Sequence, residues 1–122
     1  MKKSLRGYTN EIRTVDFLAK NGWVAVRAGG SKGMLDLDVL AYNVTTGMVK
    51  HIQAKSNKHY TKKDTEMLEM VRYIIKADNV SVELWDWRDG NQYPLITIFN
   101  MDSSTEKYST DPLISPYPGG LK

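Results

Sequence analysis

Two neighbouring segments of this 122-residue chain alternate apolar and polar residues, and they restrict the fold more than any other feature. They cover residues 35–42 and 48–56, and the stretch 43–47 between them is rich in turn-forming residues. Alternation with a period of two is typical of β-strands. The sequence therefore predicts a β-hairpin, and a hairpin closed symmetrically about the Thr45–Thr46 bond has a defined register.

Two acids on the first of these strands lie between apolar neighbours. In the symmetric hairpin Asp38 faces Gln53, and Asp36 faces Lys55. A carboxylate buried among apolar side chains is costly unless it is paired or binds a metal. One interpretation is an ordinary cross-strand ion pair with Lys55. The other is a Mg²⁺ site, since Mg²⁺ binds carboxylate oxygens, with Lys55 assisting the attacking water or stabilising charge on a phosphate.

Helical periodicity is found twice in the chain. A helix over about residues 9–20, capped by Thr9 or Asn10, precedes the hairpin. A second helix follows the hairpin, with Thr61 or Asp64 as its cap residue.

Three further strands are predicted from alternation and from the turn residues that bound them. They cover residues 23–28, 80–87 and 95–99, so the order of elements is α-β-β-β-α-β-β. We predict one domain over residues 1–99, followed by a polar tail or arm over residues 100–122.

Trp85 and Trp87 lie on one face of the strand predicted at 80–87. Indoles on nucleic-acid-binding proteins stack on bases. Large aromatic side chains more often contribute to a core or a subunit interface, which is the role that we predict for both.

The composition excludes several classes of protein. The chain has no cysteine, so disulfide frameworks, thiolate zinc sites and cysteine nucleophiles are excluded. No apolar run is long enough to cross a bilayer, and no signal-peptide core follows the basic start. We therefore expect an intracellular, cytoplasmic protein, whose short chain also suits a viral genome.

A formal net charge of +3 is too small to identify a partner, but the lysines are concentrated after the second hairpin strand. The basic residues there are Lys58, His59, Lys62 and Lys63. A charge run of this kind is either a solvated surface or a contact region for phosphates.

Five short motifs occur in order along the chain: Gly7–Glu11, Gly22–Arg27, Gly30–Gly33, Asp38–Ala41 and Gln53–Ser56. Together they are similar to the motifs of the PD-(D/E)xK nuclease superfamily, and most resemble those of the archaeal-type Holliday junction resolvases. The resemblance continues in element order to Phe99. Gln53 stands where most of these resolvases have Glu, and no proline precedes the motif aspartate.

The resemblance implies a restriction-endonuclease-like α/β fold, with a central mixed sheet flanked by helices, in a single nuclease domain. It implies that Glu11, Asp38 and Gln53 hold Mg²⁺, with Mn²⁺ as a substitute, and that Lys55 assists the attacking water. Asp36 is the second choice for the aspartate. The DNA contacts that follow from the resemblance and from the basic run are Arg27, Ser31, Lys32, Lys58, His59, Lys62 and Lys63.

The function implied in this way is Mg²⁺-dependent cleavage of four-way DNA junctions by a homodimer in recombination and repair. Two alternatives stay open at this point. One is another nuclease of the superfamily, with a restriction or repair role. The other is a nucleic-acid-binding module without catalysis, in which Gln53 marks a decayed site.

Overall fold

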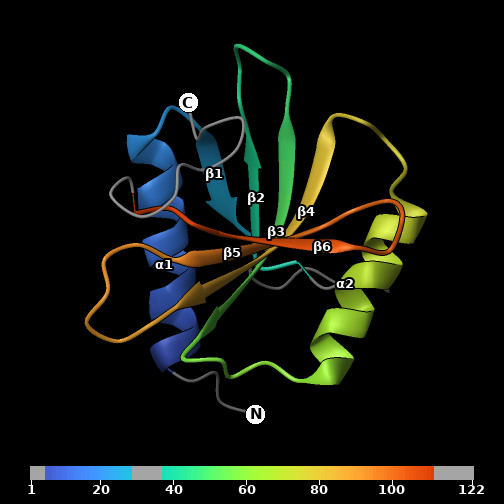
Figure 1. Ribbon diagram of the computed structural model, residues 1–122. Helices are drawn as coiled ribbons and strands as arrows, with labels where there is room; N and C mark the ends of the chain where they lie inside the picture. The colour runs from blue at the N-terminus through green and yellow to red at the C-terminus, as the bar shows by residue number, and fades with distance from the viewer. Residues whose placement is uncertain (1–4, 29–36, 112–122) are drawn as a thin grey trace.

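A mixed β-sheet with one helix on each face forms the described part of the chain (Figure 1). The computed structural model describes residues 5–28 and 37–111, with side chains from residue 8 onward. The helices and strands are α1 (Leu5–Lys20), β1 (Val24–Arg27), β2 (Val39–Tyr42), β3 (Val49–Ser56), α2 (Lys62–Ile74), β4 (Val80–Trp87), β5 (Leu95–Phe99) and β6 (Thr105–Ser109).

The strands lie in the sheet in their chain order, β1-β2-β3-β4-β5-β6. Neighbouring strands are antiparallel except β3 and β4, which run parallel. A parallel pair needs a crossover connection, and α2 supplies it. The predicted mixed sheet with flanking helices is confirmed.

The predicted hairpin register is confirmed as well. Val39 pairs with Ile52 and Tyr42 with Val49, which is the symmetric closure about the Thr45–Thr46 bond. The Asn43 side chain fixes this turn, because its Oδ1 accepts the N–H groups of both Thr45 and Thr46.

The first helix begins earlier than predicted. α1 starts at Leu5, so Thr9 and Asn10 lie inside the helix and neither is its cap. Asn10 is buried, and its carbonyl accepts a hydrogen bond from Thr14 Oγ1 one turn later. Packing of α1 on the sheet thus overrides the local preference of these residues for a helix cap.

Both predicted cap residues of α2 take part in its N-terminus. Thr61 is the N-cap and Asp64 the N3 residue of a capping box, in which each side chain accepts the backbone N–H of the other.

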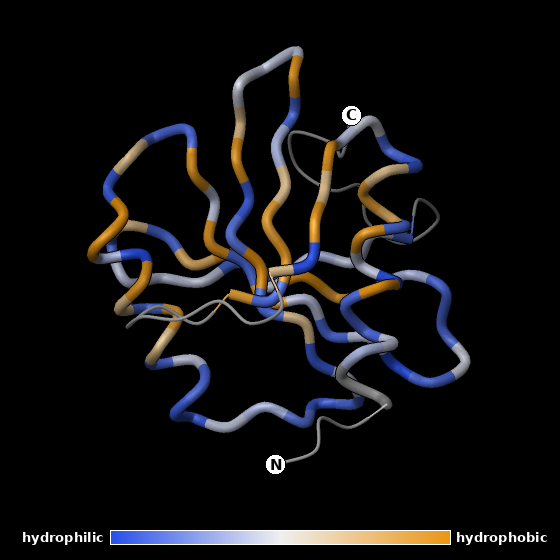
Figure 2. Tube along the Cα trace, turned by 180° about the vertical axis from the view of Figure 1, so that it is seen from behind, coloured by the Kyte–Doolittle hydropathy of each residue, from blue (hydrophilic) through white to orange (hydrophobic). Residues whose placement is uncertain are grey.

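The two faces of the sheet have separate hydrophobic cores, and apolar and polar segments alternate along the central strands in Figure 2. On the α1 face the buried cluster is Leu18, Trp23, Val39, Ala41, Ile52, Trp85, Trp87 and Ile96. On the α2 face it is Leu68, Val71, Val82, Leu84 and Phe99. The prediction that the indoles of Trp85 and Trp87 are buried rather than available to bases is confirmed.

A buried ion pair joins β3 and β4 on the α1 face. Lys50 Nζ lies 2.6 Å from Glu83 Oε2, and Ser81 Oγ and Trp85 Nε1 also donate to the Glu83 carboxylate. Burial alone would raise the pKa of Glu83. The Lys50 ammonium and the hydrogen bonds from Lys50, Ser81 and Trp85 outweigh this effect and hold that pKa below its ordinary value.

The last strand corrects one prediction. Residues 105–109, expected to belong to an irregular tail, form β6 and pair with β5. The strand lies at the edge of the sheet, with Thr105, Glu106 and Lys107 exposed, so it lacks the apolar alternation that identifies a half-buried strand. Residues 112–122 lie outside the described residues, and the division at residue 99 stays a prediction.

Candidate functional site

Asp38 directly precedes β2 and is held by both neighbouring strands. Its carbonyl accepts from Ala28 N at 2.8 Å, and its own N–H donates to Ile52 O at 3.0 Å. Its carboxylate Oδ2 accepts from Ala54 N at 2.9 Å. Ile52 and Ala54 flank Gln53, so Asp38 lies beside Gln53 as the hairpin register predicts.

Gln53 is a buried polar residue with an unusual feature. Its side chain is on the α2 face, opposite to Ile52, and only 6% of the residue is exposed. Within residues 5–28 and 37–111, Gln53 Oε1 has no hydrogen-bond partner. A buried acceptor of this kind is destabilising by about 1–3 kcal/mol, and in native proteins it usually indicates a bound water, an ion or a functional role.

Lys55 is on the same face as Gln53, two residues further along β3. Its Nζ lies 3.9 Å from Asp64 Oδ1, and both side chains are about one quarter exposed. The other carboxylate oxygen of Asp64 accepts the N–H of Thr61 in the capping box of α2. The position of Lys55 is therefore linked to the start of α2.

Glu11 lies in α1 and is buried, with 3% of the residue exposed. Its Oε1 lies 3.2 Å from Arg27 Nε at the end of β1, and the Arg27 guanidinium stacks over the Tyr8 ring at 4.3 Å. Arg27 precedes Ala28, whose N–H binds the Asp38 carbonyl. Glu11 is thus connected to Asp38 through the end of β1, while its carboxylate binds the predicted phosphate contact Arg27.

The donors at this site are suited to a hard cation. Asp38 and Glu11 offer carboxylate oxygens, and the unpartnered Gln53 Oε1 is an amide oxygen, all of which Mg²⁺ accepts. In the described part of the chain no three His, Cys, Asp or Glu side chains form a group that could hold a metal ion. The Gln53 amide oxygen, beside Asp38, would add a neutral oxygen ligand to a metal held at this site. Asp36, the second choice, lies outside the described residues.

The predicted DNA contacts of the basic run surround the turn after β3. Asn57 and Lys58 both have left-handed backbone conformations, with φ of 50° and 59°, and the turn is bound to the end of β4. Lys58 N donates to Asp86 Oδ1, and Asn57 N donates to Trp87 O. Lys58 and His59 are exposed, as are Lys62 and Lys63 in the first turn of α2. Ser31 and Lys32 lie outside the described residues.

One residue opposite Lys55 was missed by the motifs. Asp86 is buried on β4, opposite Lys55 in the parallel register, and its Oδ2 lies 2.7 Å from Arg88 Nε. The alternation of β4 places Asp86 on the same face as Leu84, but its position beside Lys55 depends on the β3–β4 pairing. No sequence pattern of either strand alone contains that information.

None of the described helices is both long and apolar enough to cross a membrane.

No protein-family model matches the chain, and no curated protein matches it in sequence. Among solved structures, it is similar to Hjc of Archaeoglobus fulgidus, a Holliday junction resolvase from an archaeal hyperthermophile. The similarity has a TM-score of 0.55 and 17% sequence identity, and it covers 90% of this chain and 87% of that chain. The chain therefore shares its fold with an archaeal Holliday junction resolvase, in agreement with the resemblance found in its motifs.

Proposed function

We propose that this protein is a Mg²⁺-dependent endonuclease that hydrolyses phosphodiester bonds of four-way DNA junctions. The observation that supports this most is the buried, unpartnered Gln53 Oε1 beside the Asp38 carboxylate, with Lys55 two residues away on the same face. The shared fold with a junction resolvase is consistent with it. The resemblance in the motifs assigns the same residues to the site.

In this proposal Asp38 and Gln53 hold the metal, with Glu11 as a further oxygen donor released from Arg27. The bound cation lowers the pKa of water and polarises the scissile phosphate. Lys55 places an ammonium group where negative charge develops on the phosphate, and Asp64 keeps that group in position. When DNA is bound, the Arg27 guanidinium contacts a phosphate in place of Glu11, and the ion pair between Arg27 and Glu11 opens.

The basic run contacts the DNA beside the cut. Lys62 and Lys63 occupy the first turn of α2, where a cation is unfavourable because it faces the positive end of the helix dipole. Binding of phosphates removes this penalty and uses the same positive potential. A junction has two equivalent strands to cut, so we propose a twofold homodimer that acts on DNA inside the cell.

The test is cleavage of an immobile four-way junction with Mg²⁺, in parallel with a flap and a linear duplex. We expect the junction to be cut preferentially, and Asp38→Asn and Lys55→Met to reduce cleavage at least 100-fold, as a lost charge-stabilising group does. Lys20→Met, at the exposed end of α1, is the matched control and keeps full activity.

Other outcomes separate the alternatives. Preferential cutting of the flap or the duplex indicates a different nuclease of the same superfamily. Tight junction binding without any cleavage in Mg²⁺ or Mn²⁺ refutes the proposed enzymatic activity. It supports instead a nucleic-acid-binding module without catalysis, the alternative suggested by Gln53 in place of Glu. If Asp36→Asn is inactive and Asp38→Asn is active, the aspartate assignment is wrong.

A further inference from the structure

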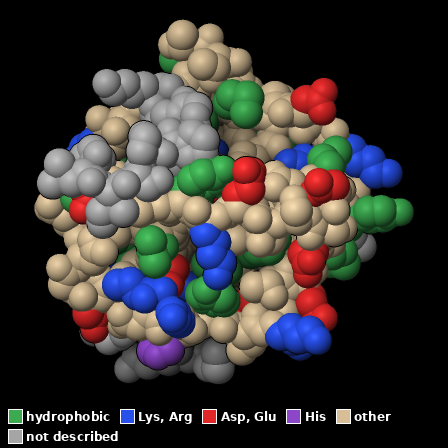
Figure 3. Space-filling view, viewed as in Figure 1, with side chains coloured by type: hydrophobic (Ala, Val, Ile, Leu, Met, Phe, Trp, Pro, Cys, Tyr) green, Lys and Arg blue, Asp and Glu red, His purple; other side chains and the backbone are tan. Residues whose placement is uncertain are grey.

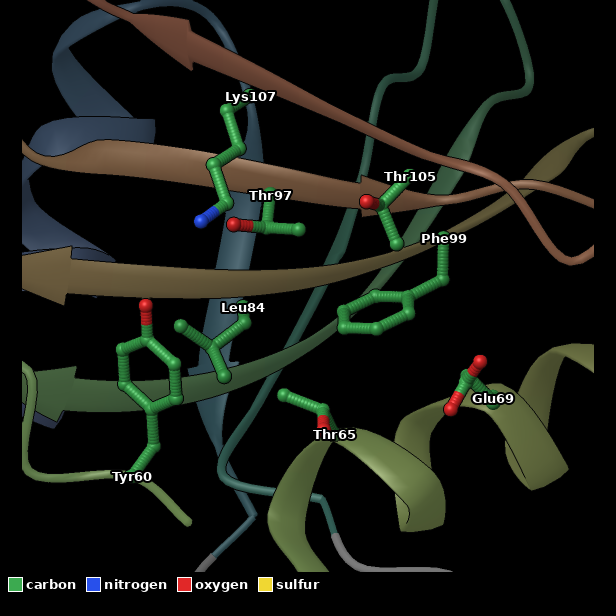
Figure 4. A pocket seen from close by; sticks show the side chains of 8 residues that line it. All are labelled: Tyr60, Thr65, Glu69, Leu84, Thr97, Phe99, Thr105 and Lys107. Atoms are coloured by element: carbon green, nitrogen blue, oxygen red, sulfur yellow. The ribbon is translucent and has the colours of Figure 1, made fainter. Parts of the chain in front are cut away.

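A groove runs over β4, β5 and β6 on the α2 face, next to the candidate site. It consists of two hollows of about 250 and 140 Å³ that share Tyr60, Thr97 and Lys107. In Figure 4, Lys107 and Thr97 lie side by side and Tyr60 points toward them from the segment before α2. We call this surface the β4–β6 groove.

The groove begins where the candidate site ends. Lys58, Asp86 and Arg88 line the smaller hollow, and Asp86 is the residue opposite Lys55 in the sheet. The amide of Lys58 binds the Asp86 carboxylate, so the turn after β3 forms part of the wall. A polymer that passes Lys55 along this face therefore continues into the groove.

The charge at this end of the groove is positive. Arg88 forms an ion pair with Asp86, and this pair leaves Lys58 and Lys107 uncompensated. In the described part of the chain neither lysine ammonium has an ion pair or a hydrogen bond. Figure 3 shows Lys and Arg side chains grouped on this face. Glu69 lines the other end and makes that end unfavourable for an anion.

The remaining lining suits a nucleic-acid strand better than a small molecule. Hydroxyl groups of Thr97 and Thr105 are donors of the kind that bind phosphate oxygens, and Tyr60 offers an aromatic ring for stacking. Both hollows are smaller than the ~300–1,000 Å³ of typical small-molecule sites. A shallow, basic, hydroxyl-lined groove matches an extended polyanion.

We infer that the β4–β6 groove binds the phosphodiester backbone of one DNA strand next to the strand that is cut, with Lys107 as a phosphate contact. The inference rests on the proposed function for the identity of the polymer. It assigns a binding role to Lys107 and Tyr60, which no sequence motif singled out.

The test measures junction binding by the full chain without metal, so that no DNA is cut, over a range of salt concentrations. One lost phosphate contact makes the slope of log affinity against log salt less steep by about 0.9, which is roughly eightfold weaker binding at 0.1 M salt. We expect this change for Lys107→Ala. Lys20→Ala, which removes one exposed positive charge at the end of α1, is the matched control with an unchanged slope.

A second measurement locates the strand. A junction with photoreactive bases beside the cut site is expected to cross-link to Tyr60. The inference is overturned if Lys107→Ala keeps the slope of Lys20→Ala, or if all cross-links lie outside the groove. These results do not depend on cleavage. A protein that binds the junction through Lys107 but never cuts DNA supports the inference about the groove and contradicts the proposed nuclease function.

Discussion

The α1 face of the sheet buries Lys50 and Glu83 as an ion pair whose carboxylate accepts two further hydrogen bonds, whereas the α2 face buries Gln53 with an Oε1 that has no partner in the described residues. Lys50 and Glu83 lie on the face of the sheet that carries the larger core, a cluster of aromatic and aliphatic side chains. The α2 face has a smaller core and a groove lined by two lysines, Lys58 and Lys107, that have no ion pair in the described part of the chain. The larger core is thus on one face, and the buried Gln53 Oε1, which has no hydrogen-bond partner in the described part of the chain and is available to a ligand, is on the other.

The largest effect is expected from breaking the pair on the α1 face. Lys50→Met leaves a charged carboxylate in the core, which costs about 3–5 kcal/mol of unfolding free energy. Adding Glu83→Gln restores most of this loss, because it removes the unpaired charge, the amide oxygen can take the place of Oε1 and accept from Trp85, and the Ser81 hydroxyl can rotate to accept from the amide N–H. Urea unfolding of the single and double variants measures both values. A single variant as stable as the wild type would contradict the assigned role of the pair.

The same pair makes stability depend on pH in the acid range. The pKa of Glu83 is lower in the folded protein than its ordinary value of 4.5, so the unfolded chain binds the proton first. The contribution is complete above that ordinary pKa and is lost as the pH falls toward the lower pKa of the folded state. Unfolding free energies measured from pH 6 downward are expected to fall less for Glu83→Gln than for the wild type.

Removal of one polar side chain on each face is expected to have opposite effects. Gln53→Leu removes the unpartnered acceptor and abolishes cleavage, while the unfolding free energy rises by up to about 1–3 kcal/mol. Thr14→Val on the α1 side deprives the buried Trp87 Nε1 of its acceptor and lowers the unfolding free energy by a similar amount. A loss of stability in Gln53→Leu would mean that Gln53 supports the fold, and the contrast between the faces would fail.

The smallest effect concerns the start of α2. Thr61→Ala and Asp64→Ala both disrupt the capping box, and each is expected to lower the unfolding free energy by about 1 kcal/mol. Only Asp64→Ala also removes the carboxylate 3.9 Å from Lys55. Junction cleavage is therefore expected to fall further in Asp64→Ala than in Thr61→Ala. Equal cleavage by the two variants would show that Asp64 does not position Lys55.

The parts of the fold that were predictable are those where an apolar pattern marks a buried face. β4 and β5 have the predicted bounds, and the hairpin register follows from the turn around Thr45–Thr46. The start of α1 was not predictable, because Asn10 has the character of a cap and is buried by packing. β6 was missed because an exposed edge strand needs no apolar residues.

The candidate site was predictable where its residues are close along the hairpin. Asp38 and Gln53 lie side by side as the register requires, and Lys55 follows on the same face. The partners Asp64 and Asp86 depend on the crossover through α2 and on the parallel pairing of β4 with β3. Lys107 reaches the groove through two further strand pairings, so its proximity to the site has no local signal in the sequence.

The polar composition that concealed β6 from sequence patterns has a consequence for how the protein associates with itself. In the described part of the chain no strand follows β6 in the sheet, so its outer backbone groups offer a template on which another chain can pair. Charged side chains on an edge strand oppose such pairing, and Glu106 and Lys107 are both exposed there. This edge is thereby protected against aggregation through strand addition, and the proposed homodimer is expected to form through another surface of the molecule.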